Sequence, residues 1–132
     1  MPEISGWSHV SLSVRDRDAT VKWYEDVLGF KTLTEMNDQD GYVRTLMMHP
    51  SGVVLGFQQH TANAGEEFGP ERTGLDHVGF GVASREELDA WAVRLGELGV
   101  TQSPVAETIY GHVLCFRDPD DLQLEFFYSP LV

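Results

Sequence analysis

Two histidines and one glutamate in this sequence have the types and positions of a metal-ligand set. His9 opens the stretch HVSLSV, His77 opens HVGFGV, and Glu125 lies in the C-terminal stretch LQLEFF. Two imidazoles and one carboxylate bind a divalent metal ion and leave coordination positions open for a substrate or for oxygen. The alternative is that the two histidines make ordinary hydrogen bonds and that Glu125 is solvated.

The two histidines hold equivalent positions in an internal repeat. They lie 68 residues apart, and a tryptophan follows each of them by fourteen residues, at Trp23 and Trp91. A Leu-Gly pair then ends each helical segment, at residues 28–29 and 98–99. Self-similarity at a fixed offset indicates a repeated structural unit.

Each repeat predicts one strand, one helix and three further strands. In the first repeat the strands are expected at 6–14, 30–36, 42–49 and 52–59, with a helix at 17–28. In the second they are expected at 74–82, 100–109, 111–117 and 121–128, with a helix that opens at the capping pattern Ser84 and Glu87 and ends near Leu98. The sequence therefore predicts an α+β fold in one domain, residues 1–132. Its modules lie at about 1–60 and 74–132, joined by a polar linker at about 61–73.

Alternation along the strands separates an apolar face from a face of small and polar residues. Because successive side chains of a strand point to opposite faces, the valine and leucine positions pack under the helices, and the histidines share the other face with serines and glycines. Small residues leave volume for a ligand. The predicted substrate pocket is lined by Trp7, Ser11, Ser13, Gly56, Gln58, Gly79, Cys115, Gln123 and Phe127. Gly56 in particular is expected to leave open space beside the metal.

Four further residues have reactive or charged side chains, but the sequence does not decide their role. Tyr110 and His112 are weak candidates for a general acid or base, because histidine titrates near neutral pH, but His112 also has the parity of the core positions of its strand. Cys115 is either a small core residue or a thiol at the pocket, and we favour the core. Arg44 either binds an anionic substrate or is simply exposed, and strand parity does not decide between the two.

The acidic composition excludes some partners. The chain has 9 basic and 21 acidic residues and a net charge of −12, whereas binding to nucleic acid or to an anionic membrane requires clustered Lys and Arg. The charge favours a cationic small molecule, or it serves solubility alone. One cysteine excludes an intrachain disulfide, and no apolar run or signal pattern is present, so we expect a cytoplasmic protein.

Three stretches resemble the vicinal oxygen chelate superfamily, which includes glyoxalases, bleomycin-resistance proteins and extradiol dioxygenases. They are HVSLSV to WYEDVLGF at 9–30, LDHVGFGV at 75–82 and FRDPDDLQLEFF at 116–127. The resemblance implies paired βαβββ modules that form a cupped mixed sheet with helices on its convex side. It also implies a homodimer and a divalent metal ion in the cup, and the sequence does not select among Fe, Mn, Zn, Ni and Mg.

Departures from the family pattern leave two functions open. Glyoxalase I proteins usually carry a fourth ligand, a glutamate, where this sequence has Gly56, and extradiol dioxygenases carry a tyrosine where it has Cys115. The first hypothesis is a metal-dependent enzyme that acts on a small oxygen-chelating substrate, as a lyase or isomerase or by oxygen activation. The alternative is a metal-free protein of the bleomycin-resistance type that binds a cationic drug.

Overall fold

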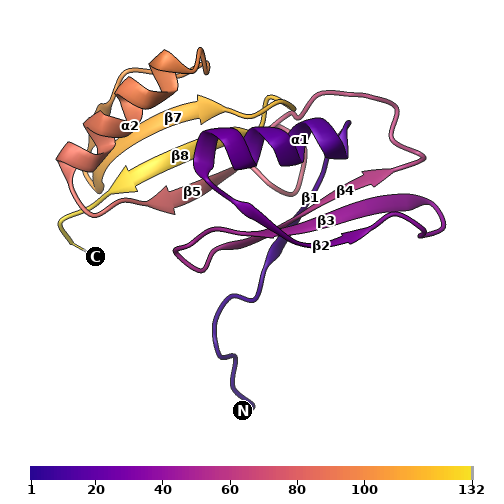
Figure 1. Ribbon diagram of the computed structural model, residues 1–132. Coiled ribbons are helices and arrows are strands. Elements are labelled where there is room, and N and C mark those ends of the chain that lie inside the picture. The colour runs from indigo at the N-terminus through magenta and orange to yellow at the C-terminus, as the bar shows by residue number, and fades with distance from the viewer. Residues whose placement is uncertain (132) are drawn as a thin grey trace. The chain divides into compact units, whose positions relative to one another are not determined.

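The chain folds into two compact units, Met1–Glu66 and Glu67–Val132. The structure is a computed structural model that describes residues 1–131 (Figure 1). The boundary between the units falls inside the predicted linker. Phe68 already belongs to the second unit, since its backbone N–H donates a hydrogen bond to the carbonyl of Asp120.

The first unit is one mixed sheet with a helical segment. In chain order its elements are β1 (Val10–Ser13), α1 (Arg17–Trp23), the π-helix η1 (Tyr24–Leu28), β2 (Lys31–Met36), β3 (Tyr42–Met48) and β4 (Val54–His60). The strand order is β1-β4-β3-β2. β1 runs parallel to β4, and the other pairs are antiparallel.

The second unit repeats this arrangement. Its elements are β5 (His77–Gly81), α2 (Arg85–Glu97), β6 (Ala106–Thr108), β7 (Gly111–Arg117) and β8 (Gln123–Tyr128), with strand order β5-β8-β7-β6. β5 is parallel to β8, as β1 is to β4. The predicted α+β class with two βαβββ modules is confirmed, and the eight strands form two four-stranded sheets.

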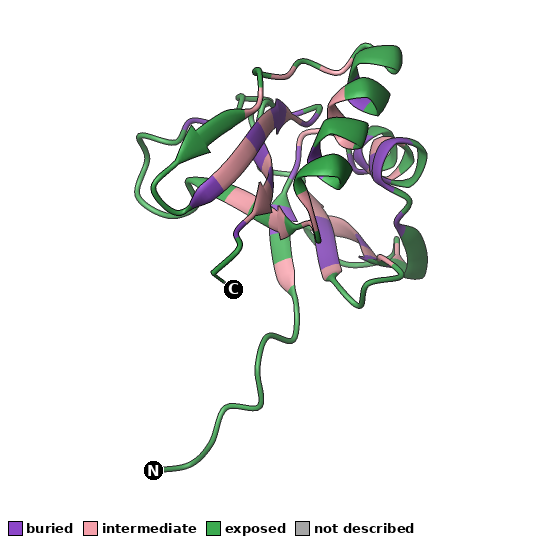
Figure 2. Ribbon diagram, turned by 90° about the vertical axis from the view of Figure 1, so that its left-hand side faces the viewer, coloured by how far each residue is buried: buried purple, intermediate pink, exposed green. Residues whose placement is uncertain are grey.

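Each unit has its core between its helix and one face of its sheet. In the first unit Met47, Leu55 and Phe57 are at most 2% exposed, and α1 packs on β3 and β4. In the second, Leu114 and Leu124 are fully buried, and α2 packs on β7 and β8. Figure 2 shows this burial along the strands. Burying a leucine side chain contributes about 1.5–3 kcal/mol, so these faces fix the orientation of every strand.

Local sequence sets where the helices begin and end. The Asp16 side chain accepts a hydrogen bond from the Ala19 N–H, and the Ser84 hydroxyl accepts one from the Glu87 N–H, so both N-termini are capped. Gly29 ends the first helical segment in the left-handed region, at φ 82°. The predicted single helix over 17–28 is in fact α-helical to Trp23 and a π-helix from Tyr24 to Leu28.

Two predicted strand boundaries are wrong. The first strand begins at Val10 rather than at residue 6, and Trp7 lies in the preceding segment with 93% of its surface exposed. The predicted strand at 100–109 is reduced to β6 and an isolated bridge from Gln102 to Phe116. Pro104 lies between these two pieces, and proline cannot donate a hydrogen bond to a neighbouring strand.

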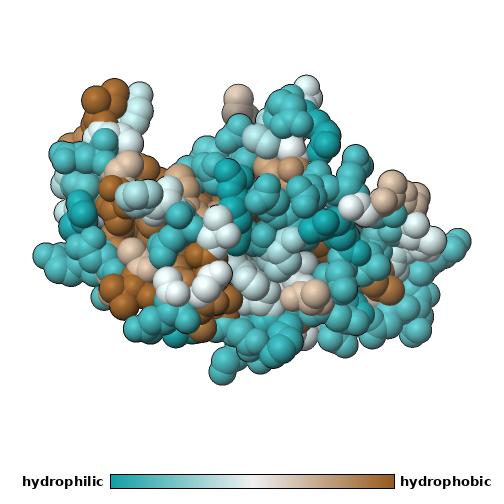
Figure 3. Space-filling view, turned by 90° about the horizontal axis from the view of Figure 1, so that it is seen from above, coloured by the Kyte–Doolittle hydropathy of each residue, from teal (hydrophilic) through white to brown (hydrophobic). Residues whose placement is uncertain are grey.

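The surface carries many polar side chains. Hydrophilic side chains cover much of the face shown in Figure 3. Over residues 1–131, the helices are too short or too polar for any of them to cross a membrane.

Candidate metal centre

A tight turn before β8 sets the register of the second unit's sheet. The Asp118 carboxylate accepts hydrogen bonds from the backbone N–H groups of Asp120 at 2.8 Å and Leu122 at 3.0 Å. Asp121 takes the left-handed conformation, with φ 63°, which aspartate tolerates in turns. The chain therefore reverses so that Arg117 pairs with Gln123 and Cys115 pairs with Glu125.

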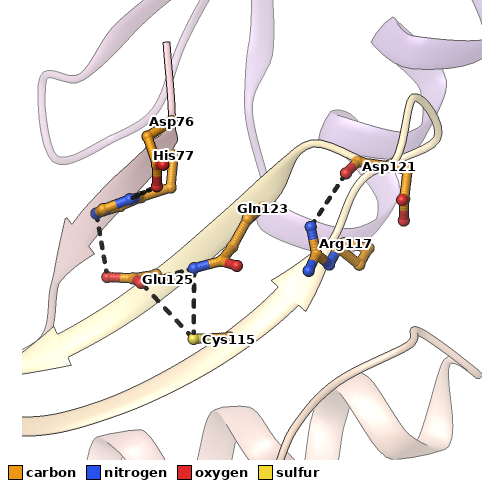
Figure 4. Close-up of polar contacts among 7 residues, drawn as sticks. All are labelled: Asp76, His77, Cys115, Arg117, Asp121, Gln123 and Glu125. Carbon is orange, nitrogen blue, oxygen red and sulfur yellow. Dashed lines mark hydrogen bonds and ion pairs between the residues drawn. The ribbon is translucent and has the colours of Figure 1, made fainter. Parts of the chain in front are cut away.

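This register gathers polar side chains on the face of the sheet opposite α2. Cys115 on β7, Glu125 on β8 and Gly79 on β5 lie side by side across three strands. His77 pairs with Gln123, two residues before Gly79 and Glu125 on the same face. Figure 4 shows the side chains of His77, Gln123, Glu125 and Cys115 directed toward one another.

The imidazole of His77 and the carboxylate of Glu125 face each other. His77 Nε2 lies 3.6 Å from Glu125 Oε2. The other ring nitrogen, Nδ1, lies 2.7 Å from the Asp76 carboxylate, which in its ionised form only accepts hydrogen bonds. Nδ1–H therefore donates to Asp76, which leaves Nε2 directed toward Glu125 Oε2. A carboxylate that fixes a histidine in this way is typical of the surroundings of a metal ligand.

Glu125 is oriented by the side chain of Gln123. The Gln123 amide donates a hydrogen bond to Glu125 Oε1 at 2.9 Å, which leaves Oε2 directed toward His77. The side chain of Glu125 is only 17% exposed. The exposed imidazole nitrogen of His77 and the largely buried carboxylate oxygen of Glu125 face each other, and such a pair is a donor set that suits a divalent cation. Two of the three predicted ligands are thus brought together.

Cys115 lies on this polar face and not in the core. It alternates with the buried Leu114 and Phe116, and its Sγ lies 3.6 Å from Glu125 Oε1. Burial raises the pKa of the Cys115 thiol, and the charge of Glu125 and the hydrogen bond to it raise this pKa further. The core position favoured from the sequence is wrong because it rested on residue type, whereas alternation along the strand puts residue 115 on the face opposite Leu114 and Phe116.

The third predicted ligand, His9, belongs to the first unit and immediately precedes β1. Its Nδ1 lies 2.9 Å from the Ser8 hydroxyl, as Nδ1 of His77 lies beside Asp76. In both repeats the residue before the histidine engages Nδ1 and leaves Nε2 for another partner. A hydroxyl can either donate or accept, so Ser8 does not fix the tautomer as Asp76 does. Across residues 1–131 no group of three or more His, Cys, Asp or Glu side chains is gathered.

The volume above Gly56 is filled, contrary to the sequence prediction. A Cβ atom placed on Gly56 would lie 2.5 Å from Ser11 Oγ and 3.3 Å from Arg44 Nη2. By contrast, no atom lies within 4 Å of a Cβ placed on Gly79 or Gly81. The open space that small residues were expected to create is present beside Glu125 and not beside Gly56.

The remaining predicted pocket residues are divided between the two units. Ser13 and Gln58 are cross-strand partners on the face that carries Ser11 and Gly56. Phe127 is half-buried on the face of Glu125, where it pairs with Gly81 and Val113. Trp7 lies in the exposed segment before β1.

The two acid–base candidates lie away from Glu125. Tyr110 is 69% exposed in the turn between β6 and β7. His112 lies three residues before Cys115 on β7 and therefore on the opposite face of the sheet. There its ring stacks on Tyr128. Its Nδ1 is buried without a hydrogen-bond partner in the described chain.

Sequence reasoning missed Asp76, which holds the tautomer of His77. The signal was available, because a polar residue precedes the histidine in both repeats, Ser8 before His9 and Asp76 before His77.

Comparison with known proteins identifies the family. The model of the Glyoxalase/Bleomycin resistance protein/Dioxygenase superfamily matches residues 6–126. The chain belongs to this superfamily. Its paired βαβββ units and the position of Glu125 after the Asp118 turn agree with the resemblance of the sequence to the glyoxalase and dioxygenase proteins.

Members of the glyoxalase superfamily match the chain over nearly its whole length. A lactoylglutathione lyase of Haemophilus influenzae is 30% identical over 122 residues, which are 89% of this chain and 88% of the relative. The crystal structure of a glyoxylase/bleomycin resistance protein/dioxygenase domain from Frankia sp. EAN1pec superposes with a TM-score of 0.89 and 35% identity, covering 96% of this chain and 99% of that one.

A structure of lower sequence identity shares the fold alone. A mutant of the fosfomycin resistance protein FosX from Listeria monocytogenes, in complex with Mn(II) and 1S,2S-dihydroxypropylphosphonic acid, superposes with a TM-score of 0.74 and 21% identity. The match covers 98% of this chain and 94% of that one.

Proposed function

We propose that this protein is a divalent-metal-dependent enzyme that acts on a small substrate with two neighbouring oxygen atoms. The observation that carries the proposal is the His77 and Glu125 pair, whose Nε2 and Oε2 atoms face each other at 3.6 Å, each oriented by its own polar neighbour. His9 is proposed as the third ligand. The FosX relative that binds Mn(II) and the family match support a metal.

A divalent ion would supply Lewis-acid chemistry, which polarises substrate oxygens and stabilises negative charge that develops on them. Asp76 holds His77 in the tautomer that ligation requires, and Gln123 holds Glu125. Gly79 and Gly81 leave space beside Glu125, so a substrate can approach there without moving a side chain. Phe127 and Val113 give this space an apolar border.

The reaction is proposed as a lyase or isomerase type. The lactoylglutathione lyase of H. influenzae supports this class. The substrate of that lyase does not follow for this chain, because residue 56, where glyoxalase I proteins usually carry the fourth ligand, is a glycine without a carboxylate. The homodimer and the cytoplasmic location remain predictions from the sequence.

The decisive experiment measures metal binding by calorimetry on protein purified without a metal-affinity tag and stripped with chelator. The intact chain should bind about one Mn²⁺ or Zn²⁺ ion per chain. His9→Ala, His77→Ala and Glu125→Gln should each weaken binding by about 100-fold or more, because each removes one of three ligands.

Matched controls are His60→Ala and Glu107→Gln, which alter exposed residues of the same types in the first and second units. They should leave the affinity unchanged. Full metal binding by the double variant His9→Ala, His77→Ala would overturn the ligand assignment. A protein that binds a cationic drug and no metal would instead support the bleomycin-resistance alternative.

A further inference from the structure

The guanidinium group of Arg44 lies over Gly56 on the first unit's sheet, on the face opposite α1. Arg44 is on β3 and Gly56 on β4, while Ser11 on β1 is the cross-strand partner of Gly56. Arg44 Nη2 donates a hydrogen bond to Ser11 Oγ at 3.3 Å. The Cβ position of residue 56 lies within 3.4 Å of both Nη2 and Nε of Arg44. Any larger residue at position 56 must therefore displace Ser11 or Arg44.

This arginine has no anionic partner among residues 1–131. Arg17 and Arg85 pair with the neighbouring carboxylates of Asp18 and Asp89, whereas Arg44 forms no ion pair, and its buried Nε has no hydrogen-bond partner. A buried donor left unpaired costs about 1–3 kcal/mol, and more when the group is charged. The chain has a net charge of −12, yet no carboxylate pairs with this arginine. The unpaired guanidinium lowers the stability of the fold unless a bound anion accepts its hydrogen bonds.

The surrounding chain holds Arg44 in place. Arg17, itself buried at the start of α1, donates a hydrogen bond from Nη1 to the backbone carbonyl of Arg44 at 3.2 Å. Residue 44 as a whole stays partly exposed, so a ligand can reach its guanidinium group. Ser11 alternates with Leu12 of the core, as His9 does with Val10, so both have the parity of the ligand face.

We propose that Arg44 and Ser11, over Gly56, form a binding site for the oxyanion group of a small molecule, of which a carboxylate is the simplest example. Guanidinium N–H groups match the two oxygens of such a group, and a serine hydroxyl can donate a further hydrogen bond. That this anion belongs to the enzyme's substrate rests on the proposed function, but anion binding itself does not. The substrate class is then an organic acid with chelating oxygens, and the cationic ligand that the net charge suggested is not expected here.

The test uses the intact chain, freed of metal with chelator, and acetate as the probe, with chloride at equal ionic strength as the reference. The ¹H–¹⁵N spectrum of arginine Nε–H groups reports on each guanidinium, and Arg44→Lys assigns the Arg44 signal. That signal should shift saturably with acetate at millimolar concentration and should not shift with chloride.

Line broadening of the acetate signal gives a second readout that does not depend on the Arg44 resonance. Arg44→Gln should weaken acetate binding by at least 10-fold, and Ser11→Ala and Arg44→Lys by a few-fold. Arg85→Gln, which removes the same charge from an exposed ion pair on α2, should leave it unchanged. Arg44→Lys keeps the positive charge and is expected to fold. If Arg44→Gln disturbs folding, the acetate affinity of Arg44→Lys still tests the proposal.

Equal acetate binding by the intact chain and by both Arg44 variants would overturn the proposal, as would an Arg44 signal that responds to chloride as strongly as to acetate. Each arm is independent of the metal. If the intact chain binds acetate but no metal, the proposed function alone is overturned. If the intact chain binds metal but no acetate, the anion site alone is overturned.

Discussion

The two units share one topology but differ in charge at equivalent positions on the ligand face. Ser11 pairs with Gly56 in the first unit as Gly79 pairs with Glu125 in the second, so Gly56 and Glu125 are counterparts. The first unit has a guanidinium group over its glycine, and the second has a half-buried carboxylate. Two side chains, Arg44 on β3 and Glu125 on β8, therefore decide whether the same framework presents positive or negative charge, and a duplicated fold can acquire two different binding chemistries.

The helix-facing sides of the two sheets differ far less. Leu55 and Phe57 in the first unit correspond to Leu124 and Phe126 in the second, and all four are at most 4% exposed. Volume and polarity are constrained where a helix packs, whereas the opposite face is free to change.

The largest expected effect tests this shared core. Leu55→Ala and Leu124→Ala should each lower the free energy of unfolding by about 2–5 kcal/mol, because each deletes a buried side chain and leaves a cavity. Urea denaturation followed by circular dichroism measures the change. Val93→Ala, at an exposed position of α2, is the control and should change it by less than about 0.5 kcal/mol. A loss below about 1 kcal/mol in only one unit would show that the two cores are not equivalent.

A smaller effect is expected at the support of Glu125. Gln123→Met removes the amide that donates to Glu125 Oε1 and keeps the length of the side chain. Metal affinity should fall about 10- to 100-fold, as is usual when a partner of a metal ligand is lost. Calorimetry measures it, with Gln58→Met on the first unit's sheet as the control. Equal losses in both variants would mean that the effect is not specific to the second unit's face.

The smallest effect concerns the pKa of Cys115, which burial and the Glu125 carboxylate raise. A raised pKa lowers the thiolate fraction at neutral pH, so iodoacetamide should alkylate Cys115 of the metal-free protein more slowly than free cysteine, with the rate rising at higher pH. Glu125→Gln removes the negative charge and should lower this pKa, which speeds alkylation at about pH 8 by a few-fold. Glu107→Gln should not change the rate. If the pH profile of alkylation is the same in Glu125→Gln, the Glu125 carboxylate does not affect the pKa of the Cys115 thiol.

The fold could be predicted because its signals are local and are present twice. The Ser84 cap, the left-handed Asp121 and the alternation around His77 each depend on a few neighbouring residues, and the repeat confirms them. The first strand's start was wrong because alternation at residues 6–9 continues where no partner strand lies alongside.

The site was only partly predictable because side-chain contacts depend on register between strands. Parity placed His77, Gln123 and Glu125 on one face. For Cys115 the preference of free cysteine for cores was weighed above the parity of its strand, and the pairing with Glu125 shows that parity was the better guide. Gly56 was interpreted as empty space because the sequence does not show that Arg44, from another strand, lies over it.

The pairing of strands within each unit has a consequence for synthesis of the chain. β4 ends at His60 and completes the first sheet, and no strand of that sheet pairs with a described residue beyond it. All partners of the first sheet have therefore been polymerised before the codon for His77 is translated. The ribosome synthesises all strands of the first sheet before it begins the second. The first hydrophobic core can therefore form while the second unit is still being synthesised.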